Sequence, residues 1–201
     1  YRGGYTRPEF TSLEEWWGTH RADYYEAFAC LGPEWDGSVD VTCFIEAHVS
    51  AQRLQVGALA LREATQRQLW TLLEDIATED LGMPPRAADA LYDAFFGRPV
   101  TNRYYRSLAD VSTATATNDL ARLEASGFLE AQGGGRSRSY TGTVRLFEAV
   151  GCAGWLGDAP TGGAADDLRA WVIATLADRV QGGGPDGRYV SVPTTIPANG
   201  R

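Results

Sequence analysis

Residues 112–143 constrain the fold of this chain more than any other stretch. Ser112 is followed by TATATNDLARLEA, in which Leu120 and Leu123 lie three residues apart, on one side of a helix. A short hydroxyl side chain is favoured at a helix N-cap, and a Ser-Gly pair ends the segment as helices commonly end. We therefore predict a helix over 113–126 capped by Ser112, although its first residues alternate threonine and alanine as a strand would.

A β-hairpin is predicted to follow this helix. Residues 128–132 and 138–143 alternate as strands do, on either side of a glycine-rich tip, GGGRS. Two helices are predicted before it, in RAADALYDAFFG, which a proline opens, and in VTNRYYRSLADVS. Over 84–145 the predicted order is helix, short strand or turn, helix, tight turn, helix and hairpin, which is the order of a winged helix-turn-helix.

The N-terminal part of the chain is predicted to be helical throughout. A run from Val41 to Gly82 carries apolar residues at helical spacing, which favours one long helix that Asp40 caps, with a break near Gly57 or Thr65 as an alternative. Two shorter helices come first, and a capping box of Ser12 and Glu15 opens the earlier of them.

The predicted fold class is therefore mostly α, a helical segment followed by a winged helix with a small β-hairpin. The expected parts are a helical segment at 1–82, a winged helix at 83–150, a linker at 151–163, a helix at 164–181 and a flexible tail at 182–201.

Composition bears on the cellular compartment in which the protein is found. No apolar run approaches the roughly 18–20 residues that cross a bilayer, and the first residues lack the layout of a signal peptide, so we expect a cytoplasmic protein without membrane contact. Three cysteines, Cys30, Cys43 and Cys152, are odd in number and form no CxxC pair. We expect them to be small buried hydrophobic residues in a reducing compartment.

Charge bears on whether the winged helix binds DNA. The net charge of −8 argues against a general polyanion binder, but residues 100–145 hold six arginines against four acids, and the chain has no lysine. If DNA binds, Thr115, Asn118 and Arg122 would face the major groove. Arg136 and Arg138 would meet phosphate or the minor groove, and Ser112 and Thr113 would donate to a phosphate. Because the reading helix carries a single arginine on that face, contacts within or between protein chains remain the other possibility.

A resemblance to a known family extends from residue 4 to residue 145. The segments GYTRPEFTSLEEWWGTHRADYYEAF and WDGSVDVTCFIEAHVSAQ resemble the part of Fic (Fido) family proteins that follows their active-site motif. The segment STATATNDLARLEASGFL, Ser112 to Leu129, resembles the winged helix that comes next in many members.

The resemblance implies a nucleotidyltransferase that moves AMP from ATP to a protein hydroxyl. The family motif, HPFx[DE]GN[GA][KR]xxR, is not in this sequence, so no catalytic, cofactor-binding or metal-binding residue is assigned to it. ATP and Mg²⁺ are implied only for the full-length family. Neither histidine replaces the motif: His20 stands at a helix start, and His48 lies on an apolar helix face, where we expect a core histidine.

We therefore expect the C-terminal portion of a Fic-family protein, which is not active alone. Its winged helix would serve regulation or targeting, through a protein target or through its own upstream Fic domain. The alternative is a DNA-binding transcriptional regulator whose N-terminal helices form a homodimer, and a third possibility is an antitoxin-like partner of another protein.

Overall fold

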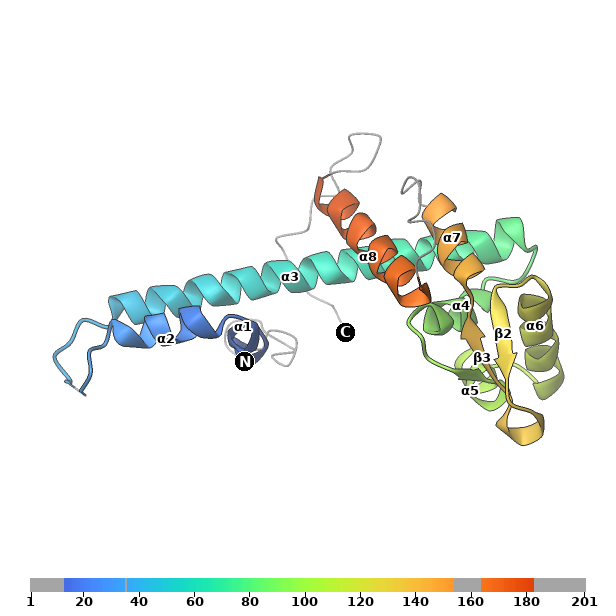
Figure 1. Cartoon of the computed structure of the whole chain (residues 1–201), viewed down its shortest axis with the longest axis horizontal. Helices are drawn as coiled ribbons and strands as arrows, with labels where there is room; N and C mark the ends of the chain where they lie inside the picture. The colour runs from blue at the N-terminus through green and yellow to red at the C-terminus, as the bar shows by residue number, and fades with distance from the viewer. Residues whose placement is uncertain (1–12, 35, 154–163, 183–201) are drawn as a thin grey trace, which may run out of the picture. The chain divides into compact units, whose positions relative to one another are not determined.

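The computed structural model describes residues 13–34, 36–153 and 164–182, which are mostly α-helical with one three-stranded antiparallel sheet (Figure 1). The chain forms two compact units that divide between Glu63 and Ala64, inside a long helix, and not at the predicted boundary after residue 82. The predicted tail at 182–201 lies outside the described residues, apart from the helical Gly182. Among the described helices, none is long and apolar enough to cross a membrane.

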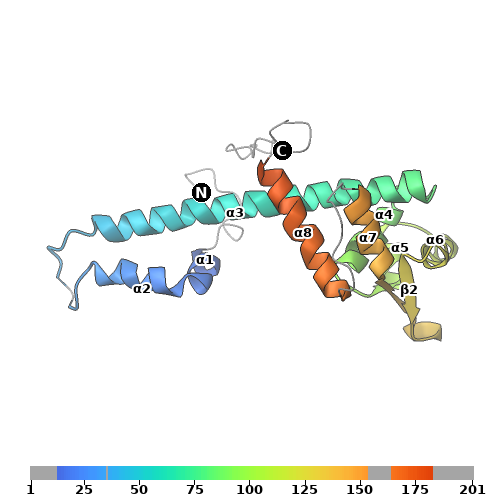
Figure 2. The same ribbon diagram turned by 45° about the horizontal axis from the view of Figure 1, so that its top comes forward.

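In the first unit two short helices, α1 (Leu13–Thr19) and α2 (Arg21–Ala29), lie beside the N-terminal half of α3 (Thr42–Asp75) (Figures 1 and 2). A cluster of five rings joins them, formed by Trp17, Tyr24, Phe28, Phe44 and His48. The His48 ring centroid lies 4.1 Å from that of Phe44 and 5.1 Å from that of Trp17. His48 lies among apolar rings with Nδ1 2.9 Å from the Phe44 carbonyl oxygen, but it is half-buried and not the buried core histidine that we expected.

Helix α3 is continuous through Gly57 and Thr65, so the alternative of a break there is wrong. A single glycine costs a helix only about 1 kcal/mol relative to alanine, which the residues around it can offset. The predicted cap is confirmed, since Asp40 Oδ1 accepts a 2.9 Å hydrogen bond from the Thr42 N–H. At its other end α3 passes into a π-helical turn, η2 (Ile76–Asp80).

Glu15 makes side-chain contacts with α3 that the sequence did not predict. Its carboxylate accepts from Gln55 Nε2 at 2.9 Å and from Arg62 Nη2 at 2.8 Å, which ties α1 to α3. Ser12, the other half of the predicted capping box, lies outside the described residues. The hydrogen bond and the positive charge of Arg62 lower the pKa of the Glu15 carboxyl.

The expectation of three buried cysteines is wrong. A disulfide joins Cys30, which ends α2, to Cys43 in the first turn of α3, with 6.5 Å between their Cα atoms. Cys152 is exposed, and it is the free cysteine of the described chain. A cysteine count cannot reveal such a pair, because the two residues meet only when α2 folds back against α3.

The second unit contains the sheet and the remaining elements. Strand β3 (Ser139–Gly142) lies between β1 (Val100–Thr101) and β2 (Leu129–Gln132), so that Tyr140 pairs with both Val100 and Ala131. The described helices of this unit besides the end of α3 are α4 (Ala87–Phe95), α5 (Asn102–Leu108), α6 (Thr113–Ala125), α7 (Val144–Ala153) and α8 (Ala165–Gly182). The element order expected for 84–145 is therefore present.

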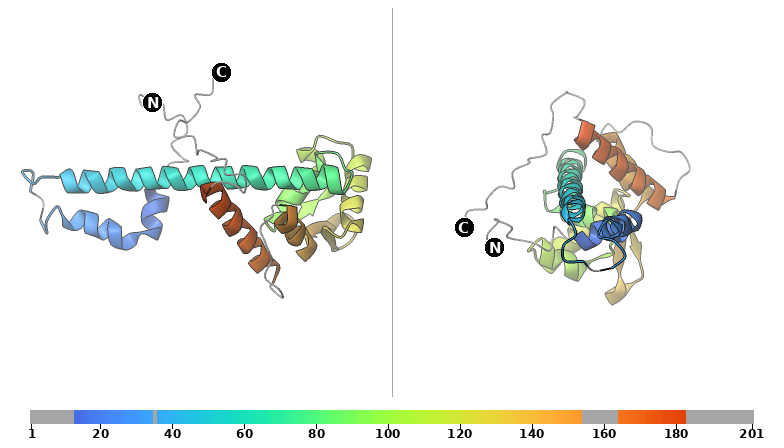
Figure 3. Two further views of the ribbon diagram at one scale, coloured as in Figure 1. Left: turned by 90° about the horizontal axis from the view of Figure 1, so that it is seen from above. Right: turned by 90° about the vertical axis from the view of Figure 1, so that its left-hand side faces the viewer.

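One apolar core serves this unit. It draws fully buried side chains from the end of α3, from α4, α5, α6 and α7, and from β1 and β2: Leu73, Leu91, Phe95, Tyr105, Leu120, Leu123, Leu146, Val100 and Leu129. Helices α7 and α8 pack together (Figure 3), and a Cβ at Gly151 would lie 2.9 Å from the Trp171 ring. The predicted linker is shorter than expected, because α7 continues to Ala153; residues 154–163 are outside the described part.

Both predicted ends of the 113–126 helix are confirmed. Ser112 Oγ accepts a 3.1 Å hydrogen bond from the Thr115 N–H. Gly127 follows the helix with a φ of +78°, and the Phe128 N–H donates to the Leu123 carbonyl, the pattern of a Schellman motif. Glycine adopts this left-handed conformation without the steric cost that other residues carry.

We expect the disulfide to stabilise the first unit by about 3 kcal/mol, because it closes a loop of roughly a dozen residues in the unfolded chain. In the Cys30→Ser, Cys43→Ser variant, amide exchange in α1 and α2 should become faster, and added reductant should have no further effect. Cys152→Ser is the matched control and should keep the wild-type response to reductant. Equal exchange in the double variant and the wild type would contradict the prediction.

We also expect Glu15→Gln to weaken the attachment of α1 to α3, by an amount that depends on pH. The pKa of Glu15 is lower in the folded protein than in the unfolded chain, so its contribution to stability is present above the unfolded value of about 4.3 and is lost as the pH falls through the folded one. Amide exchange across α1 should therefore be faster in the variant at pH 7, and the difference from the wild type should shrink as the pH falls below the unfolded pKa of about 4.3. Glu26→Gln, an exposed change on α2, should have no such effect.

Candidate functional site

The candidate site is the surface formed by α5, α6 and the β2–β3 hairpin. Thr101 caps α5, its Oγ1 accepting a 3.2 Å hydrogen bond from the Tyr104 N–H. A turn of four residues then leads into α6, and Asp110 in this turn has a φ of +51°, in the left-handed region that aspartate tolerates better than most residues. This turn sets the direction in which α6 leaves α5.

The hydroxyl groups at the start of α6 are already engaged within the protein. Ser112 Oγ accepts from the Thr115 N–H and lies 2.9 Å from Thr115 Oγ1. Thr113 Oγ1 accepts a 2.8 Å hydrogen bond from Arg106 Nη1. Two residues that we expected to donate to phosphate therefore hold the helix start, and they bring a guanidinium beside it.

The outer face of α6 differs in part from the predicted one. Asn118 is exposed and its side chain has no hydrogen-bonding partner in the described structure, whereas Thr115 is half-buried. Arg122 Nη2 donates to the carbonyl oxygens of Leu81 and Gly82, at 3.3 and 3.2 Å. The exposed residues of the helix are Thr113, Ala114, Thr117, Asn118, Ala121, Arg122 and Ala125, and Arg122 is the charged one among them.

The hairpin offers less free positive charge than its sequence indicates. Arg138 Nη2 lies 2.6 Å from Glu124 Oε2 on α6, and its guanidinium stands 5.2 Å from the centre of the Tyr140 ring. Arg136 belongs to a 3₁₀ turn, Gly135–Ser137, at the hairpin tip, and its side chain is outside the described part. One of the two expected wing arginines is thus paired with a carboxylate.

A buried polar network behind this surface fixes the relation of α4, α5 and α6. Asp119 is almost fully buried, and its carboxylate accepts from Arg86 Nε at 2.8 Å, from Arg86 Nη2 at 3.3 Å and from the Tyr105 hydroxyl at 3.1 Å. Burial first, and then the charge of Asp119, raises the pKa of Tyr105, while the hydrogen bond that Arg86 donates to Asp119 raises the pKa of Arg86. Tyr105 therefore stays neutral and donates a hydrogen bond to the carboxylate.

The sequence carried a signal for this network. Asp119 stands beside Leu120 and three residues after Ala116, on the side of the helix that we predicted to be buried. A charge on such a face needs a partner, and Arg86 is the one that the fold supplies.

A second, smaller network lies at the other end of α4. Asp93 is buried and accepts from Arg98 Nη1 at 3.2 Å and from the Tyr104 hydroxyl at 2.7 Å, and this last bond is the main cause that raises the pKa of Tyr104. Tyr105 and Tyr140 are buried, whereas Tyr104 is 43% exposed and its hydroxyl donates to Asp93.

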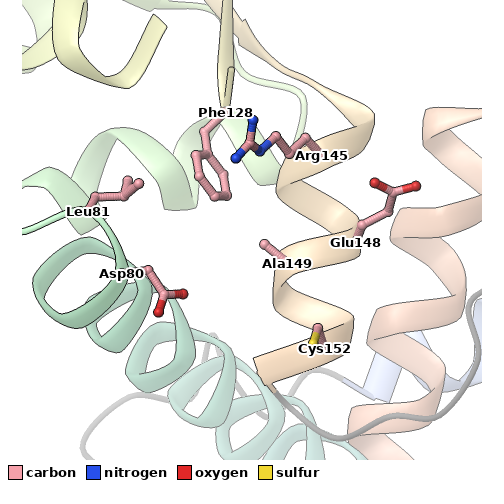
Figure 4. A pocket seen from close by; sticks show the side chains of 7 residues that line it. All are labelled: Asp80, Leu81, Phe128, Arg145, Glu148, Ala149 and Cys152. Carbon is pink, nitrogen blue, oxygen red and sulfur yellow. The ribbon is translucent and has the colours of Figure 1, made fainter. Parts of the chain in front are cut away.

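A shallow hollow of about 440 Å³ lies between η2, the start of β2 and α7 (Figure 4). Its walls are formed by Asp80, Leu81, Phe128, Arg145, Glu148, Ala149 and Cys152. The Arg145 guanidinium stands 5.5 Å from the centre of the Phe128 ring. Among the described residues no group of histidine, cysteine and acidic side chains is arranged to hold a metal ion.

Comparison of the chain with protein families, with characterised proteins and with solved structures finds no match.

Removal of the Arg86 side chain should cost the second unit about 2–3 kcal/mol of folding free energy, because Arg86→Leu leaves the Asp119 carboxylate buried without its cation. Denaturant unfolding measures the loss. Arg103→Ala, an exposed arginine on α5 with no ion pair in the described structure, is the control and should stay within about 0.5 kcal/mol. The double variant Arg86→Leu, Asp119→Leu should recover much of the loss, since no buried charge remains. A double variant no more stable than Arg86→Leu would contradict this account.

Proposed function

We propose that residues 84–145 form a winged helix-turn-helix that contacts protein, and that it serves regulation or targeting in a Fic-type nucleotidyltransferase. The order α4, β1, α5, α6, β2 and β3, with β3 in the middle of the sheet, supports the fold assignment. The tight turn before α6 and the Ser112 cap support the comparison of α6 with the second helix of such a motif.

One observation carries the choice of protein over DNA. Arg122 hydrogen-bonds to backbone carbonyls, Arg138 is paired with Glu124, and apart from Arg122 the exposed residues of α6 are alanines, threonines and Asn118. Affinity for DNA comes largely from the neutralisation of phosphates by free cations. A small, uncharged helix face suits close approach by another protein surface better than it suits a polyanion.

The Fic part of the proposal rests on the order of the resembling segments. Helices α1, α2 and the start of α3 form where SLEEWWGTH, RADYYEAF and VTCFIEAHVSAQ stand in the sequence. On this proposal AMP transfer, ATP and Mg²⁺ belong to the family motif that the sequence does not contain, and this chain supplies contacts with the target protein or with the catalytic part of the enzyme.

A DNA-binding regulator is the alternative, and one feature favours it. Arg103 is exposed on α5 without an ion pair in the described structure, and Arg106 reaches Thr113 at the start of α6. A helix N-terminus attracts phosphate, and α6 is 13 residues long. These groups, with Arg136, are the ones that would meet a DNA backbone.

Fluorescence anisotropy with a labelled 30-base-pair duplex separates the two functions. We expect no saturable binding at about 10 µM protein in 50 mM salt, because few free cations face the surface. Binding whose log–log salt slope is about −3 to −5, and which weakens in the Arg136→Ala, Arg138→Ala variant, would establish the regulator instead.

Glu124→Gln is the matched variant for this measurement. It releases Arg138 from its carboxylate and removes one negative charge from the surface without changing the size of the side chain. If pairing of Arg138 is what suppresses DNA binding, this variant should bind the duplex more tightly than the wild type does.

A further inference from the structure

An apolar stripe lies uncovered on the N-terminal half of α3, within the first unit. Val41 is 41% exposed, Ile45 53% and Val49 61%. The stripe continues to Gln52 and Val56, both half-buried, so that residues 45, 49, 52 and 56 follow one another at intervals of four, three and four. This is the spacing of the contact seam between two packed helices.

The two flanks of this stripe differ. On one flank Phe44, His48 and Gln55 face α1 and α2, which occupy that side of the helix. On the other flank Glu46 and Arg53 are exposed, and neither has an ion-pair partner in the described structure. They are seven residues apart, about 10 Å along the axis, so they cannot pair with each other within the helix.

We propose that this stripe binds a second copy of the chain, with the two α3 helices antiparallel. An alignment centred between residues 50 and 51 sets Ile45 opposite Val56 of the second copy and Val49 opposite Gln52. The same alignment places Glu46 within about 3 Å, along the axis, of the level of the second copy's Arg53, on the same flank. The dimer therefore contains two such pairs of opposite charge, one at each end of the contact, and a twofold axis relates them.

The charges select the antiparallel orientation. In a parallel pair the flank that bears Glu46 and Arg53 would face the opposite flank of the second copy, which carries His48 and Gln55 and is covered by α1 and α2. Gln52 interrupts the apolar seam, and a polar residue there fixes the register at some cost in affinity. The pairing uses only the first unit, and it does not depend on what the winged helix binds.

The full chain in solution tests the pairing. Light scattering after size exclusion should give about 44 kDa, twice the chain mass of 21.8 kDa, at micromolar concentrations. Glu46→Arg and Arg53→Glu should each weaken self-association about tenfold, because each change sets like charges opposite each other at two places. Carrying both changes in one chain should restore the wild-type dissociation constant. An equimolar mixture of the two single variants should form a heterodimer in preference to either homodimer.

Ile45→Glu with Val49→Glu should give a monomer whose helix content by circular dichroism is unchanged, since both side chains are exposed in the single chain. A wild-type chain that stays monomeric at about 200 µM would overturn the proposal. The same result would follow if other residues covered the stripe in place of a second copy. A dimer that persists in this variant, or charge reversals that do not compensate, would overturn it as well.

Discussion

The buried carboxylate of Asp119 is the group on which the arrangement of α4, α5 and α6 depends. It takes hydrogen bonds from the side chain before α4 and from Tyr105 in α5, and so it joins three helices at one point. Apolar packing of Leu120 and Leu123 would tolerate some sliding or rotation of α6. The hydrogen bonds that the Arg86 guanidinium and the Tyr105 hydroxyl donate to Asp119 form in only one arrangement of the helices. The exposed face of α6, and therefore whatever it binds, is set by this network.

Ion pairs within the second unit take up part of the positive charge of its arginines. Arginine is the chain's only strong base, and Arg86, Arg98 and Arg138 each bind a carboxylate of the same unit. A planar fork that holds a carboxylate or a backbone carbonyl stabilises the fold, but it offers less to a phosphate outside. The local excess of positive charge in the sequence thus overstates the positive charge that a ligand would meet, and the proposal of a protein partner rests on this difference.

Local patterns predicted much of this structure, and long-range pairings account for the rest. Ser112 and Gly127 mark the ends of α6 because caps depend on residues a few positions apart, and the same holds for the turn chemistry of the hairpin. The partners of Glu15 stand 40 and 47 residues away, and the partner of Asp119 stands 33 residues away. Nothing in the spacing of such residues selects one arginine among several. The sequence accordingly assigned the candidate residues to a helix and a hairpin that form, but it did not reveal how their charges are engaged.

The first unit shows how a small helical group compensates for a thin core. Among its described residues the buried apolar side chains are only Ala27 and Ala51, and the larger rings form a half-covered cluster at the interface with α3. A core of this size leaves little free energy after the cost of chain ordering, and small units commonly add a cross-link or a partner. The Cys30–Cys43 disulfide is such a cross-link, and the exposed stripe of α3 is the surface on which a partner would complete the core. Both features would therefore stabilise a unit with a small core. The disulfide limits the entropy of the unfolded unit, and a second copy would remove the remaining apolar surface from water.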